Sequence, residues 1–351
     1  MKHRLSSWRL LFTLLTVLVI GLAYGAVQYS LDRPVVVPKS AQLDNQGRLQ
    51  WRIERGTNLS RVSAELYNQQ IISCPFFITA YAKLTDTATI QAGDYWISST
   101  DTVRSLINKF HKGLVIRYKI TFPEGWTFKQ WINHLGQVPQ FSNINALSTS
   151  ELLKEANIDV AHPEGWFFPD TYSYSAADSA TAILNQAYQQ MLGILDNAWQ
   201  LRAPNLPYKT AYEALIMASI IEKETGLAEE RNAIAGVFVR RLQRGMRLQT
   251  DPTVIYGMGD RFTGNIRRRD LKQKTPYNTY RINGLPPTPI AMPSEAAIQA
   301  ALDPESGSSL YFVARGDGSH QFSDTIEEHQ KAVKYFQINR RAKNYQSLPQ
   351  K

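Results

Sequence analysis

The sequence predicts an α+β protein that has an N-terminal transmembrane helix, a small βααβ subdomain and a larger mixed α+β domain. Three observations predict this class: an uncharged apolar run at 10–31, short strand patterns around two helical segments at 49–113, and an all-apolar helical segment among aromatic, proline-rich loops at 114–345. The remaining segments are an N-terminus at 1–9, a linker at 32–48 and a tail at 346–351.

The composition limits the function classes. The 351 residues carry a formal net charge of +9, which suits an acidic polymer, an anionic membrane surface or another polyanion. A single cysteine excludes an internal disulfide framework and a multi-cysteine zinc site. The six histidines have no paired ligand spacing, so we expect no metal and no cofactor.

The apolar run Leu10–Leu31 contains no charged residue and is long enough to span a bilayer as a helix. Basic residues precede it, which favours a cytoplasmic N-terminus; they are Lys2, Arg4 and Arg9. A cleaved signal peptide is the alternative, but Tyr24 makes Leu22–Ala26 a poor cleavage site. We therefore expect a retained single-pass anchor, with the rest of the chain exported and no nucleic acid as partner.

The small subdomain combines alternating strands with amphipathic helices. The expected strands are 49–53 and 93–97, and the expected helices begin at 59, 75 and 105; a longer strand, 114–122, is expected directly after the subdomain. The turn and helix from Gly56 to Leu66, followed by Ile71 and Ile72, resemble a LysM module, a small carbohydrate-binding βααβ fold. A structural unit without a ligand site is the alternative interpretation.

One helix carries the candidate chemistry. Thr210 and Glu213 form a capping-box pattern, so the helix should begin at Ala211 and run to Thr225. Its residues 214–221 are apolar all round, which predicts burial on most sides. Glu222 continues an apolar stripe, and desolvation would raise its pKa toward that of a general acid. Glu224 points about 200° away on a helix and is expected to face solvent. The alternative is that both glutamates are solvated or ion-paired.

Downstream loops supply a candidate binding wall. A helix is expected from about Glu229 to Arg244, followed by loops at 246–257, 275–280 and 283–293 whose many prolines restrict the chain. The candidate substrate contacts are Gln249, Thr250, Asp251, Tyr277, Asn278 and Tyr280. Packed loops without a ligand are the alternative, and Asp251 before Pro252 is either a second carboxylate or a structural turn residue.

Three further features are expected to be structural. The aromatic segment 166–172 is expected to close a core rather than stack on sugars, and Arg267–Arg269 to form a solvated face. Residues 310–322 form a hairpin pattern with a Gly-Asp-Gly turn, and His320 just after it is expected to be exposed.

Four blocks together resemble the YceG-like family: residues 164–172, 218–225, 247–257 and 277–287. The resemblance implies one inner-membrane helix, a LysM-like subdomain and a periplasmic catalytic domain. It further implies an endolytic lytic transglycosylase that cuts the MurNAc-GlcNAc β-1,4 bond within nascent glycan strands and ends strand elongation beside peptidoglycan synthases. The first glutamate of the Glu-Lys-Glu block, Glu222, takes the catalytic role in this resemblance.

Such an enzyme needs one carboxyl group. Protonated Glu222 would donate to the glycosidic oxygen, and the muramyl C6 hydroxyl would attack C1 to leave a 1,6-anhydro end. Tyr277 and Asn278 are candidates for orienting Glu222 or the substrate acetamido group. Two alternatives remain open: a hydrolysing muramidase that uses Asp251 and water, and a non-enzymatic glycan-binding scaffold of the synthesis machinery.

Overall fold

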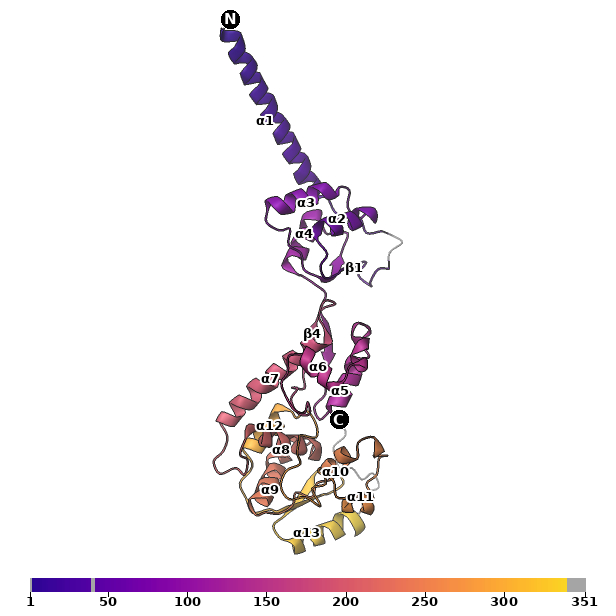
Figure 1. Cartoon of the computed structure of the whole chain (residues 1–351), viewed down its shortest axis with the longest axis vertical. Coiled ribbons are helices and arrows are strands. Elements are labelled where there is room, and N and C mark those ends of the chain that lie inside the picture. Colours follow the sequence, from indigo (N-terminus) through magenta and orange to yellow (C-terminus); the bar gives the residue numbers. More distant parts are fainter. Residues whose placement is uncertain (1, 39–41, 340–351) are drawn as a thin grey trace. The chain divides into compact units, whose positions relative to one another are not determined.

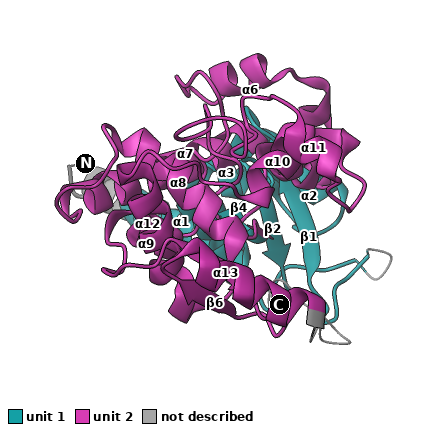
Figure 2. Ribbon diagram, turned by 90° about the horizontal axis from the view of Figure 1, so that it is seen from below, with its two compact units in different colours: residues 1–119, 173–178 teal, residues 120–172, 179–351 magenta. Residues whose placement is uncertain are grey.

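The computed structural model describes residues 2–38 and 42–339, and it has the mixed α+β composition that the sequence predicts. The chain divides into two compact units (Figure 2): unit 1 comprises Met1–Lys119 and Ser173–Asp178, and unit 2 comprises Ile120–Tyr172 and Ser179–Lys351. The division after Lys119 lies later in the chain than the expected boundary after residue 113, and a short later segment returns to unit 1. The expected tail, 346–351, lies outside the described residues.

The N-terminal helix α1 spans Lys2–Asp32. Its segment Leu11–Asp32, of 22 residues, is long and apolar enough to cross a membrane, and no other described helix is. The helix agrees with the expected range of 10–31.

Unit 1 has the expected βααβ order. Strand β1 (Leu49–Ile53) pairs antiparallel with β2 (Gly93–Ile97), with Trp51 opposite Tyr95. Helices α2 (Leu59–Asn68) and α3 (Pro75–Leu84) lie between them in sequence, and α4 (Val103–Lys112) follows. The first turn of α4 is closed by a capping box, and Gly113 ends the helix with φ 64°, a conformation that glycine adopts without strain.

The expected linker, 32–48, begins inside this unit. Leu31 is 0% exposed and Val35 is also buried, and both belong to the hydrophobic core of unit 1. The Val35 N–H donates to the Asp101 carbonyl at 2.8 Å. The start of the segment is thus packed and hydrogen-bonded, because its valine fills the same core as the end of α1.

The expected strand at 114–122 is shorter than its alternating pattern. Strand β3 covers only Tyr118–Thr121 and pairs with β4 (Thr171–Tyr174). Before it, the N–H groups of Val115 and Ile116 donate to the carbonyls of Gly113 and Asp94, at 2.7 and 2.6 Å. These bonds use the backbone donors that a longer strand would need.

Unit 2 is mainly helical. Its helices are α5 (Phe128–Leu135), α6 (Thr149–Glu155), α7 (Ala180–Gln200), α8 (Ala211–Glu224), α9 (Arg231–Gln243), α10 (Asp251–Met258), α11 (Arg268–Lys272), α12 (Glu295–Leu302) and α13 (Ile326–Val333). The expected hairpin is present as β5 (Tyr311–Ala314) antiparallel to β6 (His320–Ser323). Helix α10 replaces part of an expected loop, because a proline at the second residue, Pro252, is compatible with a first helical turn.

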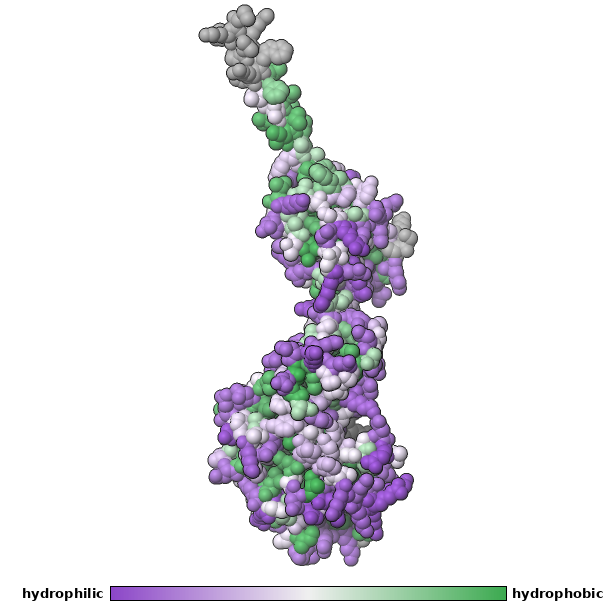
Figure 3. All heavy atoms as spheres, viewed as in Figure 1, coloured by the Kyte–Doolittle hydropathy of each residue, from purple (hydrophilic) through white to green (hydrophobic). Residues whose placement is uncertain are grey.

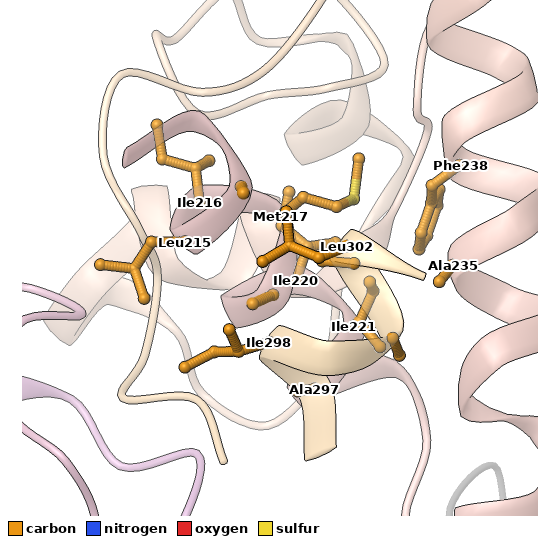
Figure 4. Close-up of a cluster of buried hydrophobic side chains, with 14 of the residues drawn as sticks. Leu215, Ile216, Met217, Ile220, Ile221, Ala235, Phe238, Ala297, Ile298 and Leu302 are labelled. Carbon is orange, nitrogen blue, oxygen red and sulfur yellow. The ribbon is translucent and has the colours of Figure 1, made fainter. Parts of the chain in front are cut away.

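Helix α8 is the centre of the unit 2 core, as its apolar sequence predicts. Every side chain from Ala214 to Ile221 is buried. Figure 4 shows residues of α8 packed against Phe238 of α9 and Ile298 of α12. The Thr210 hydroxyl accepts from the Glu213 N–H at 3.3 Å, which fixes the predicted start of the helix. The helix ends at Glu224, one residue earlier than expected, because Thr225 is extended.

The aromatic segment 166–172 contributes to the core of unit 2, as expected. Phe167 and Tyr172 are buried, and both rings lie within 6.4 Å of the Trp131 ring. Arg267, Arg268 and Arg269 are exposed, as expected for a solvated face.

Candidate active site

Unit 2 contains a cavity of about 2040 Å³. Its walls come from the end of α8, the segment 248–252, α10, the loop at 277–280, the β5–β6 hairpin, α13, and the segments 125–133 and 162–164. The volume exceeds the ~300–1,000 Å³ typical of a small-molecule pocket, so it can take a segment of an extended polymer.

Glu224 brings a carboxyl group to this cavity. Burial raises the pKa of Glu224 to about 7, and the negative charge of Asp251 acts in the same direction. The Thr250 hydroxyl donates to Glu224 Oε1, which partly opposes that shift. Glu224 was expected to face solvent, but it is partly buried on the cavity wall, because the segment that carries Thr250 contacts this side of the end of α8.

Buried threonines hold the backbone of Thr250. The Thr250 N–H donates to Thr279 Oγ1 at 3.0 Å, and Thr253 Oγ1 donates to the Thr250 carbonyl at 2.8 Å. The preceding residue, Gln249, also lines the cavity and has φ 55°. A left-handed conformation is uncommon for a residue with a side chain, which is typical of a segment held by its surroundings.

Asp251 and Tyr280 form a second polar pair on the cavity wall. Asp251 is exposed at the first residue of α10, and its Oδ1 accepts a 2.7 Å hydrogen bond from the Tyr280 hydroxyl. Burial and the adjacent Asp251 raise the pKa of Tyr280, so this hydroxyl stays protonated and can donate. Five expected contact residues thus line one cavity: Gln249, Thr250, Asp251, Tyr277 and Tyr280.

Glu222 does not line this cavity. Its Oε2 accepts from the Ser294 N–H at 3.1 Å and from the Ser294 hydroxyl at 2.5 Å. Ser294 is the N-cap of α12, and its hydroxyl also accepts from the Ala297 N–H. Burial raises the pKa of Glu222, while the Ser294 hydrogen bonds lower it. These hydrogen bonds join the ends of α8 and α12. The catalytic role expected for Glu222 stays a prediction.

Asn278 also lies away from the cavity wall. It is buried, and its Nδ2 donates to the carbonyls of Asp270, Leu271 and Gln273, while its Oδ1 accepts from the Tyr280 N–H. All of its hydrogen-bonding groups therefore act within the loop, so this amide holds the Tyr280 loop and is not available to substrate.

Tyr277 does line the cavity. Its hydroxyl lies 2.8 Å from Thr288 Oγ1, and its ring meets the Tyr256 ring edge to face at 4.9 Å. The Tyr256 hydroxyl in turn donates to Glu164 Oε2 at 2.9 Å.

Glu164 is a cavity residue that the sequence analysis did not single out. Its Oε1 accepts from the Phe128 N–H at 2.9 Å, and burial raises its pKa to about 7. Both carboxylate oxygens already have donors within the protein. The sequence does contain a signal for Glu164: it is a glutamate next to an aromatic segment, and such surroundings favour a desolvated carboxyl group.

Two further basic side chains lie on the cavity wall, Arg241 and His320. Arg241 is buried: its Nε donates to the Leu310 carbonyl at 2.7 Å, and its guanidinium lies 5.0 Å from the Tyr311 ring centre. His320 was expected to be exposed but is buried, with Nδ1 at 2.7 Å from Glu230 Oε2. The hairpin folds against α9 and therefore covers both side chains. Among the described residues, no group of three or more His, Cys, Asp and Glu side chains could hold a metal ion.

A large cavity with polar walls and carboxyl groups whose pKa is near neutral is typical of enzymes that use general acid–base catalysis on large polar substrates. The chain belongs to the YceG-like family, whose family model matches residues 51–335.

Characterised relatives and a solved structure cover most of the chain. The chain is 29% identical over 335 residues to the endolytic murein transglycosylase of Bacillus subtilis strain 168, covering 90% of both chains. It is 27% identical to the endolytic murein transglycosylase of Streptococcus pneumoniae R6, covering 88% of this chain and 61% of that protein. The crystal structure of a putative yceG-like protein, lmo1499, from Listeria monocytogenes has a TM-score of 0.53 and 29% identity, covering 82% of this chain and 99% of that one.

Proposed function

We propose that this protein is a lytic transglycosylase that cuts within peptidoglycan glycan strands, with Glu224 as its general acid and base. The observation that carries the proposal is the Glu224 carboxyl group on the wall of a polymer-sized cavity, with a pKa of about 7. A group with a pKa near neutral can both give and take a proton. The names of the Bacillus and Streptococcus relatives support this activity and this substrate.

The reaction needs no water. Glu224 donates its proton to the glycosidic oxygen between N-acetylmuramic acid and N-acetylglucosamine, and the bond from that oxygen to C1 of the muramyl sugar breaks. The C6 hydroxyl of the same sugar forms the new bond to C1, because an intramolecular nucleophile has a high effective concentration. The Glu224 carboxylate then accepts the C6 proton, which restores the acid and leaves a 1,6-anhydro end.

The proposal moves the acid from Glu222 to Glu224. Each carboxylate has one oxygen that accepts no hydrogen bond from the described residues, Oε1 of Glu222 and Oε2 of Glu224, but only Glu224 lines the cavity. The free oxygen of Glu224 suits proton transfer to a substrate. The nearby charge of Asp251 favours the protonated form of Glu224, so Asp251 acts as an electrostatic partner in this mechanism.

The anchor and the cellular role are part of the same proposal. Helix α1 crosses the inner membrane with residues 1–9 in the cytoplasm, as the positive charges before the apolar run favour. The cavity then lies in the periplasm, where nascent glycan strands are made, and cutting them ends their elongation beside peptidoglycan synthases. The βααβ subdomain of unit 1 is a candidate LysM-like glycan contact.

The test uses the full chain in detergent, since Leu31 and Val35 belong to the folded core. Purified glycan strands are digested by wild type, Glu224→Gln, Glu222→Gln and the exposed control Glu155→Gln, and the product ends are read by mass spectrometry. We expect anhydro ends from every protein except Glu224→Gln.

Each other outcome identifies a different function. Loss of anhydro ends in Glu222→Gln alone, with its fold intact, would return the acid to Glu222. Reducing ends from wild type would indicate a muramidase that uses Asp251 and water. Strand binding without cleavage by any of the proteins would indicate a glycan-binding scaffold.

A further inference from the structure

Helix α3 of unit 1 has an apolar outer face. Ile78 and Ala82 lie in the core, whereas Phe76 is 70% and Leu84 is 87% exposed. Residues 76, 80 and 84 lie above one another on a helix, so the two exposed side chains flank Ala80 in one strip. Lys83 is exposed beside them. Two large, exposed apolar side chains on one helix face indicate a surface that meets something other than water.

This face lies at the base of α1. The Arg104 side chain joins the two helices: its Nε donates to Asp32 Oδ1 of α1 at 2.7 Å, and its Nη1 donates to the Tyr81 hydroxyl of α3 at 2.8 Å. Leu31 is buried in the same unit, so the end of α1 is a fixed part of unit 1. Figure 1 shows α3 next to the point where α1 leaves the unit.

The packing of α1 shortens the length that remains for a bilayer. Val27 packs against the unit 1 core, and Gln28 bonds to Arg104, so the last turns of α1 belong to protein. Between Arg9 and Val27, the 10–26 segment rises about 26 Å at ~1.5 Å per residue. A bilayer hydrocarbon core is about 30 Å thick, so this segment is short by roughly one helical turn.

A short span brings its flanking residues to the lipid surface. Tyr24 is 66% and Tyr29 is 67% exposed on α1, as expected for side chains at a membrane interface. In Figure 3 the hydrophobic surface of α1 leads to the end of unit 1 where α3 lies. Because α3 contacts the last turns of α1, its exposed apolar side chains lie on the helix of unit 1 that is next to the end of the span.

We propose that the outer face of α3, formed by Phe76, Ala80 and Leu84, inserts into the outer surface of the lipid bilayer that α1 crosses. Lys83 then reaches the lipid phosphates, as long basic side chains at interfaces do. Unit 1 is held to the bilayer at two places, the helix α1 and the face of α3. The proposal rests on the membrane anchor of the proposed function and is independent of the Glu224 chemistry.

The test places an environment-sensitive fluorophore on α3. The sole cysteine, Cys74, is the N-cap of α3 without a side-chain cap bond, so Cys74→Ser provides a cysteine-free background with a good capping residue. Leu84→Cys carries the probe, and Glu54→Cys, an exposed site after β1, carries it in the matched control. The full chain is reconstituted into vesicles of phosphatidylethanolamine and phosphatidylglycerol.

We expect the probe at position 84 to emit at shorter wavelength, to be quenched by nitroxide-labelled lipids, and to be quenched several-fold less by iodide than the probe at position 54. Adding Phe76→Asp should restore iodide quenching. Equal iodide quenching at 84 and 54 overturns the proposal. Shielding of 84 that appears in native membranes but not in pure lipid vesicles also overturns it and indicates a protein partner.

A third probe separates this proposal from the anchor itself. Leu18→Cys lies in the middle of the 10–26 segment and should be quenched by nitroxides deep in the bilayer. A probe at position 18 that iodide reaches would refute the membrane anchor, whereas a lipid-embedded position 18 with an exposed position 84 would refute only the docking of α3.

Discussion

Replacing Thr250 by valine should raise the pH at which the enzyme loses activity. The Thr250 hydroxyl donates to Glu224 Oε1 and stabilises the carboxylate form. Valine keeps the shape of threonine and removes only the donor. Because the proposed mechanism starts from protonated Glu224, kcat/KM falls as pH rises through the pKa of this group, which is about 7 in the wild type.

The size of the shift follows from the strength of one hydrogen bond. A hydrogen bond to a charged group contributes about 1.5–3 kcal/mol, and one pKa unit corresponds to about 1.36 kcal/mol. Loss of the Thr250 donor should therefore move the midpoint upward by roughly 1–2 pH units. The Asp251 charge and the burial of Glu224 remain and act in the same upward direction.

The assay is the initial rate of anhydro-end formation at low substrate from pH 5 to 10. Thr253→Val is the matched control, because Thr253 is buried in the same threonine cluster but bonds only to the Thr250 carbonyl and the Thr279 hydroxyl. The control should lose stability and keep the wild-type midpoint. A Thr250→Val midpoint that stays in place or falls, or an equal shift in both variants, would refute the assignment of Glu224.

Three further variants test the roles given to other residues. Ser294→Ala removes the side-chain cap of α12 and the hydroxyl donor to Glu222, and it leaves the backbone N–H donor in place. It should lower the free energy of unfolding by about 1–2 kcal/mol in denaturant titrations, while folded enzyme still makes anhydro ends; inactivity at full stability would contradict this role. Leu31→Ala opens a cavity in unit 1 and should cost about 2–5 kcal/mol by the same measurement, whereas a neutral effect would mean that α1 ends outside the core. Asn278→Ala leaves three loop carbonyls without their donor and should speed limited proteolysis at 270–281, with no change there if the loop is held by other contacts.

The sequence pattern correctly predicted those helices and strands whose ends are set by residues close in the chain. The capping residue Thr210 predicted where α8 begins, and the apolar run after it predicted that α8 is buried. The Gly-Asp-Gly turn predicted the β5–β6 hairpin. The expected strand 114–122 is shorter in the structure, because the N–H groups of Val115 and Ile116 donate to the carbonyls of Gly113 and of Asp94 in β2. A periodic pattern states what a segment favours, but tertiary contacts decide where it ends.

The sequence predicted several of the residues that line the cavity, whereas the assignment of the acid to Glu222 stays a prediction beside the proposed Glu224. Five of the expected contact residues line one cavity, since the loops that carry them pack near the end of α8. The choice between Glu222 and Glu224 depended on which side of α8 faces the cavity. A helix that is apolar on all faces carries no information on that point, because the hydrophobic pattern has no polar side to orient it.

Residues 173–178 belong to unit 1 although they follow the first part of unit 2 in the chain. Unit 1 can therefore finish folding only after that part of unit 2 has been synthesised. Arg55 donates to the Ala177 carbonyl, Arg117 lies 3.5 Å from Asp178, and the Tyr118 and Tyr174 rings are 5.6 Å apart. These contacts cannot form until the ribosome has added about 55 residues beyond Lys119, so unit 1 stays incomplete while the first part of unit 2 is already being made. A gene fragment that stops at residue 119 would therefore encode an unfinished unit, and a unit 2 that begins at residue 120 would carry six residues whose partners are absent.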